Sequence, residues 1–405
     1  MLNFNDTEKA FAYKTNKQLK KATRLFSLMQ YGSLVKMGTV LTPLALKWHL
    51  PIKGIIKNTL FDQFVGGASL EASSPVIEML HQHHVDVILD YGVEGGEYNE
   101  KKYDHSLEEF LKVIRFAATK KNTPFISVKI TGITSFALLE KLNLSHYQSF
   151  EFVSDEVMTN KINLLTQEEK TAWENLLQRA EKICQTASET GVGVMIDAEE
   201  SWIQDPIDYV TILLSRKFNK NKSVVYNTLQ FYRHDRMSFM REAYQDSLQH
   251  NYTFAVKIVR GAYMEKERAR AQQQNYPSPI HENKSRVDHD YNEAISYCMG
   301  ENKSISLIVA SHNEESTQWA ITSAEKNNIP QQKDRLHFSQ LYGMSDNLTF
   351  NLADKGFSVS KYLPFGPIDE VIPYLMRRAQ ENSSVSGQTN RELMLLKQEC
   401  KRRGI

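Results

Sequence analysis

The sequence predicts an α/β protein, a (β/α)8 TIM-type barrel with an N-terminal helical arm. Eight short apolar runs recur along the chain, and a segment with helical periodicity follows each of them. Polar residues or glycines gather where each run ends. Eight such units fit a closed barrel better than a doubly wound sheet. We expect an arm over residues 1–60 and a barrel with a C-terminal helix over residues 61–405.

The arm begins with helical spacing of apolar residues over Thr15–Met29. The longest apolar stretch, Tyr31–Leu50, contains Lys36, Pro43 and Lys47. These interruptions argue against a membrane-spanning helix. A packed helix is expected there, and an amphipathic element at a membrane surface is the alternative.

The eight candidate strands share a short β-like pattern that ends in a polar or glycine-containing cluster. In order they are Asp86–Asp90, Phe125–Ile130, Val192–Ile196, Val224–Asn227, Phe254–Val259, Ser304–Ala310, Leu336–Leu341 and Phe357–Leu363. The second and third are separated by about 60 residues, so extra helix is expected between them.

A helix is expected over Gly366–Ser384, with two stripes at helical spacing. The apolar stripe is Val371, Ile372, Leu375, Met376 and Ala379, and the polar stripe is Tyr374, Arg377, Arg378 and Glu381. Paired arginines beside a tyrosine suit a carboxylate ligand. A solvated face with Arg–Glu pairs is the alternative. Pro373 lacks a backbone donor, so the helix is expected either to start late or to bend there.

The composition is that of an ordinary globular protein, with a net charge of +1, 41% hydrophobic and 24% charged residues. This balance gives no sign of a polyanionic partner. Cys184, Cys298 and Cys400 lie far apart without a CxxC motif, which fits a reducing compartment. Early polar residues interrupt any secretory signal. A cytoplasmic location is expected, with peripheral contact at the inner face of a membrane left open.

Several catalytic motifs are missing from the sequence. It contains no GxGxxG after the first candidate strand, no GxxxxGK[ST] loop, no HExxH and no GxSxG. His81, His83 and His84 point in different directions on a helix, so they are interpreted as ordinary helix residues. No metal site is expected.

Polar residues stand in or after several candidate strands, at the end where barrel active sites lie. They are Lys129, Asp197, Gln230, Lys257, Arg260 and His312. Each alone could be an outward-facing surface residue. Together they favour a site for a small acid and an anionic cofactor that supplies the chemistry.

Seven motifs resemble the proline dehydrogenase family and occur in that family's order. They are SVKITG (Ser127–Gly132), MIDAEES (Met195–Ser201), NTLQFY (Asn227–Tyr232), KIVRGAYMEKER (Lys257–Arg268), ASHN (Ala310–Asn313), QLYGM (Gln340–Met344) and YLPFGPIDEVIPYLMRRAQEN (Tyr362–Asn382). The resemblance covers about residues 85–385. It implies a distorted barrel that binds FAD, oxidises L-proline to 1-pyrroline-5-carboxylate, the first step of proline degradation to glutamate, and passes electrons to a quinone.

The resemblance also implies roles for individual residues. The substrate carboxylate would be held by Arg377, Arg378 and Lys129, and the substrate ring would be walled by Leu341, Tyr362 and Tyr374. Glu94 and Glu381 would position the arginines, and Asp197 would be the acid of the site. FAD would be contacted by Ala198, Gln230, Lys257, Arg260, Gly261, Ala262, Ser311 and His312.

One position departs from the bifunctional bacterial members, which carry arginine where this chain has Lys257 near the flavin. Lysine retains the positive charge but cannot make a bidentate contact. The length also leaves no room for a second, aldehyde dehydrogenase module. Both features resemble the monofunctional, eukaryote-like branch.

Two alternatives remain open at this stage. One is a hydroxyproline dehydrogenase, and Tyr362 argues against it because its ring would crowd a 4-hydroxyl group. The other is a non-catalytic barrel that binds a small carboxylate. The cations at the strand ends, together with Asp197, favour the enzyme.

Overall fold

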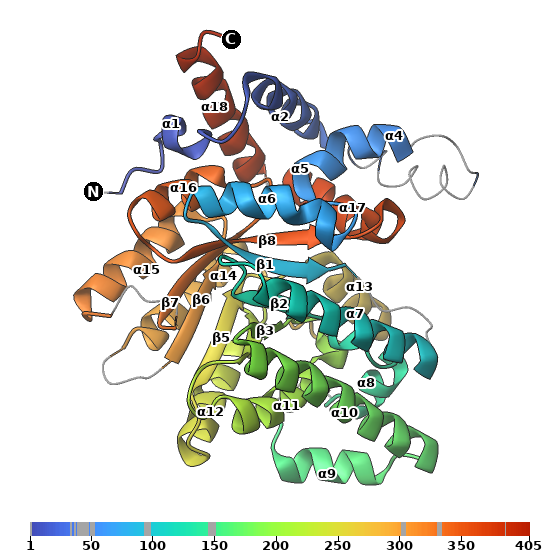
Figure 1. Cartoon of the computed structure of the whole chain (residues 1–405). Coiled ribbons are helices and arrows are strands. Elements are labelled where there is room, and N and C mark those ends of the chain that lie inside the picture. The colour runs from blue at the N-terminus through green and yellow to red at the C-terminus, as the bar shows by residue number, and fades with distance from the viewer. Residues whose placement is uncertain are drawn as a thin grey trace. The chain divides into compact units, whose positions relative to one another are not determined.

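The computed structural model describes residues 2–32, 35, 38, 48, 53–92, 99–144, 151–300, 305–329, 334–384 and 386–405. Its eight strands form one closed parallel barrel in chain order (Figure 1). The strands are β1 (Asp86–Tyr91), β2 (Phe125–Val128), β3 (Gly193–Ile196), β4 (Val225–Gln230), β5 (Phe254–Val259), β6 (Ile305–Ala310), β7 (Leu336–Leu341) and β8 (Val359–Phe365). The predicted fold class is therefore confirmed.

A helix follows each strand, as predicted. These helices are α7 (Glu100–Ala118), α8 (Phe136–Leu142), α9 (Asp155–Asn163), α10 (Gln167–Thr190), α11 (Ser201–Phe218), α12 (Arg236–Gln249), α13 (Met264–Gln274), α14 (Lys284–Cys298), α15 (Glu314–Lys326), α16 (Asp346–Asp354), α17 (Ile368–Ser384) and α18 (Ser386–Arg402). The extra helix expected between the second and third strands is present as α8, α9 and α10.

Three strands have a boundary that differs from the sequence prediction by more than one residue. Strand β2 ends at Val128, and residues Ile130–Gly132 form a 3-10 turn (η2). The turn is held because the Glu199 carboxylate accepts hydrogen bonds from the backbone and hydroxyl of Thr131. Strand β4 continues to Gln230, and β8 runs from Val359 to Phe365. In both cases pairing with a neighbouring strand outweighs the local sequence pattern.

The chain divides into two compact units, residues 1–92 with 339–405 and residues 93–338. In the second unit, β2 to β6 pair side by side in parallel register. Their residues are almost all buried, as expected for strands covered on both faces.

The N-terminal helices belong to the first unit. They are α1 (Thr7–Ala10), α2 (Asn16–Met29), α4 (Lys53–Ile56), the π-helical turn η1 (Lys57–Phe61), α5 (Asp62–Phe64) and α6 (Leu70–Gln82). The predicted helix over residues 15–29 is confirmed: Thr15 caps α2 with a capping box. Its apolar face packs against α18, with Leu19 and Phe26 in the core of this unit. Most of residues 31–50 lie outside the described part of the chain.

A buried charged group lies within the first unit. Lys361 of β8 forms an ion pair of 2.9 Å with Asp346, which begins α16. Asp346 also accepts a hydrogen bond of 2.7 Å from the Tyr13 hydroxyl. Glu392 of α18 accepts a hydrogen bond from the backbone of Ser345. These contacts link the N-terminal arm, α16, β8 and α18 around polar groups that have partners.

Among the helices that the structure describes, none is long and apolar enough to cross a membrane.

Candidate active site

The second unit places four polar side chains in one row across neighbouring strands. Val128 pairs with Ile196, and Ile196 pairs with Asn227. One residue further along these strands stand Lys129, Asp197 and Thr228, and Thr228 pairs with Lys257. The row therefore collects two predicted cations and the predicted acid just past the ends of β2 and β3 and in the carboxyl-terminal half of β5.

Side-chain contacts confirm that part of this row faces the barrel interior. Asn227 donates to Asp208 of α11 at 3.0 Å, so it points outward to the helices. Alternation along the strand directs Tyr226, Thr228 and Gln230 inward. The Tyr226 hydroxyl accordingly lies 3.1 Å from the Ser306 hydroxyl, which belongs to β6, two strands away.

Lys257 and Asp197 form a buried ion pair across β4, with side chains 5% and 12% exposed. Removing two charges from water is costly unless they pair closely. The pairing holds the ammonium and carboxylate groups at fixed positions beside Thr228. This arrangement offers a substrate or cofactor one buried cation and one buried anion.

Glu199 was missed by the sequence analysis. Burial raises the pKa of Glu199 to about 7, although hydrogen bonds from Thr131 and the charge of Lys129 act in the opposite direction. Its carboxylate binds Thr131, and its backbone oxygen accepts a 2.7 Å hydrogen bond from Gln230. The DAEE sequence after β3 carries three acids, but only the fold shows which one joins the ends of β2 and β4.

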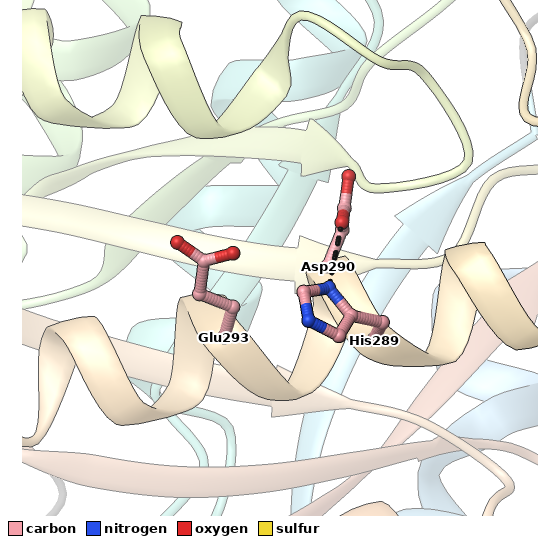
Figure 2. Close-up of side chains that lie close together, drawn as sticks. All are labelled: His289, Asp290 and Glu293. Carbon is pink, nitrogen blue, oxygen red and sulfur yellow. Dashed lines mark hydrogen bonds and ion pairs between the residues drawn. The ribbon is translucent and has the colours of Figure 1, made fainter.

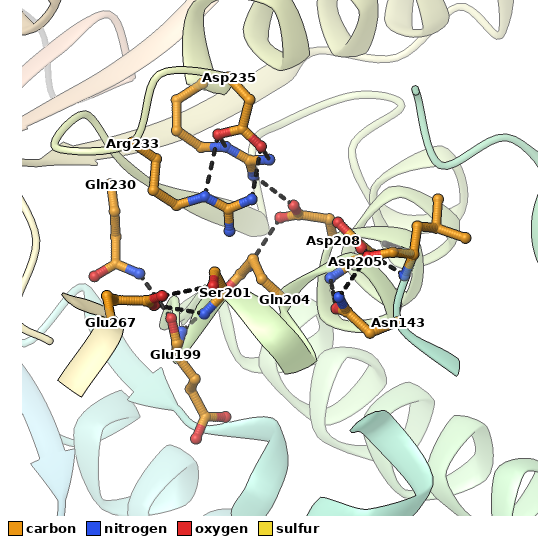
Figure 3. A network of polar contacts seen from close by, with 12 residues as sticks. Asn143, Glu199, Ser201, Gln204, Asp205, Asp208, Gln230, Arg233, Asp235 and Glu267 are labelled. Atoms are coloured by element: carbon orange, nitrogen blue, oxygen red, sulfur yellow. Dashed lines mark hydrogen bonds and ion pairs between the residues drawn. The ribbon is translucent and has the colours of Figure 1, made fainter. Parts of the chain in front are cut away.

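A buried polar network continues outward from Glu199 (Figure 3). Gln204 accepts from the Glu199 backbone at 2.8 Å and donates to Asp208 at 3.0 Å. Asp208 forms an ion pair of 2.8 Å with Arg236, and Arg236 also binds Asp235 at 2.6 Å. The network fixes the loops after β3 and β4 to the helices behind them.

Arg260 after β5 is held by several partners. Asp288 accepts from its Nε at 2.9 Å, Ser311 from its Nη1 at 2.7 Å and Ser316 from its Nη2 at 2.9 Å. The guanidinium lies 4.4 Å from the ring centre of Tyr291. Burial tends to raise the pKa of Asp288, but hydrogen bonds from Lys284 and Arg260 keep it below the ordinary value. Asp288 was not identified from the sequence, because it lies on α14, 28 residues from Arg260.

The backbone beside Arg260 has the form of a cradle. Gly261 has φ of +136°, and a Cβ atom there would lie 2.5 Å from the ring of Tyr232. Only glycine avoids that collision. Gly261 and Ala262 are exposed, and the Ala262 backbone donates to Gln230 at 3.3 Å. Exposed backbone next to a fixed arginine fits an anionic ligand.

The remaining predicted contacts of the second unit follow neighbouring strands. Ala198 is half-buried after β3. Ser311 is buried after β6 and accepts from Arg260, while His312 is half-buried beside it. The structure thus brings Arg260, Ser311 and the Gly261–Ala262 backbone together.

The first unit contains the predicted substrate-binding residues of β7, β8 and α17. Helix α17 begins at Ile368, ahead of Pro373, so the late start considered from the sequence does not occur. Val371, Leu375 and Ala379 are buried as predicted. Tyr374 and Arg378 are also buried, at 7% and 6% exposure. The solvated-face alternative is therefore wrong for these two residues.

Within this unit, the Arg378 guanidinium lies 5.2 Å from the ring centre of Tyr374. Arg377, Leu341 and Tyr362 are half-buried. The backbone of Tyr342 donates to the Tyr362 carbonyl at 2.9 Å, which ties the ends of β7 and β8. Glu94 lies outside the described residues, and the side chain of Glu381 is likewise not described.

A separate acid–histidine group lies on α14 (Figure 2). The side chains of His289, Asp290 and Glu293 place potential metal-ligand atoms within 4.8 Å of one another, and this is the one such group among the described residues. Asp290 already binds His281 at 2.7 Å, and Glu293 pairs with Arg241 at 2.6 Å. Both carboxylates therefore have partners in the protein itself.

The barrel and the charged groups at its strand ends define a (β/α)8 protein with a strand-end site of the kind that enzymes use. The family model described as proline dehydrogenase matches residues 74–391. The chain therefore belongs to the proline dehydrogenase family, an oxidoreductase family, as the sequence motifs indicated.

Individual relatives agree with this membership. The chain is 32% identical over 379 residues to "Proline dehydrogenase 1, mitochondrial" of Dictyostelium discoideum, covering 87% of this chain and 66% of that one. It is 30% identical over 434 residues to the protein of the same description from Arabidopsis thaliana, covering 100% and 87%. It is also 29% identical over 421 residues to "Hydroxyproline dehydrogenase" of Xenopus laevis, covering 99% and 90%.

A solved structure shares the fold. Proline utilization A from Bdellovibrio bacteriovorus, inactivated by N-propargylglycine, aligns with a TM-score of 0.70 at 21% identity. The alignment covers 93% of this chain and 38% of that chain. This chain therefore spans well under half of that larger protein.

Proposed function

We propose that the protein is an FAD-dependent enzyme that oxidises L-proline to 1-pyrroline-5-carboxylate and passes the electrons to a quinone. The observation that carries this proposal is the family match over residues 74–391. The buried Lys257–Asp197 pair and the fixed Arg260 support it, because both belong to strand ends that the family uses for its site.

The proposed cofactor site lies at the ends of β4, β5 and β6. Arg260 would neutralise a phosphate of FAD, and the glycine backbone at residue 261 would let the chain approach it closely. Lys257 would place a positive charge beside the flavin, and Gln230, Ala198, Ala262, Ser311 and His312 would make the remaining contacts. Bound FAD would accept the hydride that leaves proline.

The proposed substrate grip uses Arg377, Arg378 and Lys129 on the carboxylate. Each charge-assisted hydrogen bond of this kind contributes about 1.5–3 kcal/mol when well formed. Tyr362, Tyr374 and Leu341 would enclose the ring, and Glu94 and Glu381 would position the arginines. A site rich in cations favours the neutral form of the substrate amine, which is the form that can release hydride.

The visible spectrum of the purified protein tests this proposal directly. FAD gives a yellow protein, and anaerobic proline should bleach the flavin absorbance. A yellow protein that proline does not bleach would contradict the substrate assignment. A colourless protein that FAD cannot reconstitute would instead favour the non-catalytic carboxylate-binding barrel.

Hydroxyproline is the second candidate substrate, because one relative is described as hydroxyproline dehydrogenase. Tyr362 favours proline, since its ring would crowd a 4-hydroxyl group. Turnover on proline and hydroxyproline should be compared in wild type and Tyr362→Ser. We expect wild type to prefer proline and the variant to gain relative activity on hydroxyproline. Faster wild-type oxidation of hydroxyproline would reverse the assignment.

We also propose that the N-terminal arm contacts a membrane surface, where quinones reside. Leu28, Tyr31, Trp48 and Ile55 are 59%, 61%, 73% and 67% exposed, which is unusual for large apolar side chains so close in sequence. Exposed apolar residues of this kind favour the interfacial region of a bilayer. The cytoplasmic location predicted from the cysteines stays a prediction.

Vesicle flotation tests the membrane contact. Trp48→Ser should reduce the fraction of protein that floats with vesicles of anionic lipid. Trp319→Ser is the matched control, because Trp319 is also exposed, at 48%, but lies on α15 in the other unit. If both variants lose the same fraction of vesicle-bound protein, or if neither loses any, the proposed membrane contact of the arm is wrong.

A further inference from the structure

Thr228 is buried, but its hydroxyl makes no hydrogen bond to the part of the protein that the structure describes. The residue is 4% exposed, and Oγ1 has no partner among the described atoms. A buried hydroxyl without a partner loses its hydrogen bonds to water and receives nothing in return. Such a group in a native protein calls for an explanation.

The position of Thr228 on β4 shows that its hydroxyl faces the barrel interior. Asn227 and Thr228 are adjacent on β4 and point to opposite faces, and Asn227 points outward to Asp208. Thr228 is thus directed inward, in register with Lys257. The Lys257–Asp197 ion pair joins β5 to the end of β3 and passes across β4, the strand that carries Thr228. The hydroxyl belongs to the row that the proposed site is built from.

The neighbouring side chains on the same face are already engaged. Tyr226, two residues earlier, contacts Ser306 at 3.1 Å. Gln230, two residues later, donates to the Glu199 carbonyl and accepts from the Ala262 backbone. Between two fixed polar neighbours, Thr228 is the member of this face whose hydrogen-bonding capacity the protein leaves unused.

We propose that Thr228 is a further cofactor-binding residue, and that its hydroxyl hydrogen-bonds the polar ring system of the bound flavin. This rests on the proposed FAD-dependent function. A threonine hydroxyl can both donate and accept, so it suits the carbonyl and nitrogen atoms of a flavin ring. The hydroxyl would thus be an unfavourable group in the cofactor-free protein and would be satisfied when the cofactor binds.

Thr228→Val removes the hydroxyl and keeps the shape of the side chain, so it should raise the stability of the apoprotein and lower its affinity for FAD. Without cofactor, the variant should melt at a higher temperature than wild type, because the unpartnered hydroxyl is gone. With cofactor, it should bind FAD more weakly, by about 5- to 100-fold in Kd, the range expected for losing one buried hydrogen bond. The flavin absorbance maxima should shift as well.

Thr123 supplies a matched control. Its hydroxyl is also buried, at 2% exposure, and also has no partner among the described atoms. It precedes β2 and therefore lies at the end of the barrel opposite the proposed site. Thr123→Val should raise the melting temperature of the apoprotein and leave FAD affinity unchanged. Thr228→Ser, which keeps the hydroxyl, should bind FAD with near wild-type affinity.

The experiment is fluorescence titration of apoprotein with FAD, beside thermal unfolding of each apoprotein. Weaker FAD binding by Thr228→Val, with both controls near wild type, supports the inference. Wild-type affinity in Thr228→Val overturns it, while wild-type bleaching by proline would leave the proposed function standing. Equal weakening in Thr228→Val and Thr228→Ser also overturns it, because a variant that keeps the hydroxyl would then lose as much affinity as one that lacks it. Wild-type protein that binds no FAD overturns both.

Discussion

Arg236 offers a severe test of the buried network behind the site. It is 2% exposed and binds Asp208 at 2.8 Å and Asp235 at 2.6 Å, with side chains 0% and 16% exposed. Arg236→Met keeps most of the apolar stem but leaves Asp208 without its ion-pair partner, while Asp235 keeps its 2.6 Å pair with Arg233. Breaking a buried pair in this way costs about 3–5 kcal/mol of unfolding free energy.

The same helix provides a control. Arg241 pairs with Glu293 at 2.6 Å, but these side chains are 54% and 39% exposed. An exposed pair contributes about 0.2–1 kcal/mol, so Arg241→Met should be nearly neutral. Urea unfolding followed by circular dichroism would compare the two variants with wild type, provided that their m-values agree.

The loss in Arg236→Met should also depend on pH. Burial already raises the pKa of Asp208, and Arg236 opposes that rise. Without the arginine, the folded-state pKa should rise further above the unfolded value, so the folded state favours the protonated acid. The penalty is then absent at low pH and grows as the pH rises through the folded pKa. We expect a smaller loss at pH 5 than at pH 8.

Two results would refute this reasoning. The first is a loss in Arg236→Met no larger than that of Arg241→Met. The second is a loss that grows as the pH falls, which would mean that the Asp208 carboxylate is not the group whose lost partner costs stability.

Three further outcomes are expected. Arg378→Met should raise the KM for proline about 10- to 100-fold, because one charge-assisted hydrogen bond is lost, and should leave the flavin absorbance unchanged. The control Arg115→Met, on the exposed face of α7, should have no effect on KM. A normal KM in Arg378→Met would show that Arg378 does not bind the substrate carboxylate. Lys361→Met should lower the unfolding free energy by about 3–5 kcal/mol, because buried Asp346 loses its closer cation at 2.9 Å and keeps only Lys14 at 3.5 Å. A loss below about 1 kcal/mol in urea unfolding would contradict this. Burial raises the pKa of Glu392 to about 7 from an ordinary 4.5, so its contribution to stability is fully present below pH 4.5 and is lost as the pH rises through 7. Glu392→Gln should remove roughly 3 kcal/mol of that pH dependence. An unchanged dependence of the melting temperature on pH would contradict this prediction.

Local patterns were enough to predict the barrel. Each strand has a short apolar run with a polar end, and the order of strands in a (β/α)8 barrel follows the order along the chain. The boundary errors arose where long-range contacts act. The Glu199 carboxylate, which arrives from β3, captures Thr131 and ends β2 early.

The motifs also singled out individual residues from the sequence alone, including Lys257, Arg260 and Arg378, whose roles stay predictions. Residues that hold these side chains or the neighbouring strand ends in place from other elements were not identified from the sequence. Asp288 holds Arg260 from a helix 28 residues away, and no local spacing connects the two. Glu199 looked like one acid among three until its contacts with Thr131 and Gln230 were seen.

The sequence thus carries the periodicities and motifs, because those depend on neighbours along the chain. Burial and pairing depend on neighbours in space, and they come from the fold. Thr228 illustrates the division: as a letter in NTLQFY it is an ordinary strand residue with a β-branched side chain. In the barrel it is an inward hydroxyl beside a buried ion pair, with no protein partner among the described atoms.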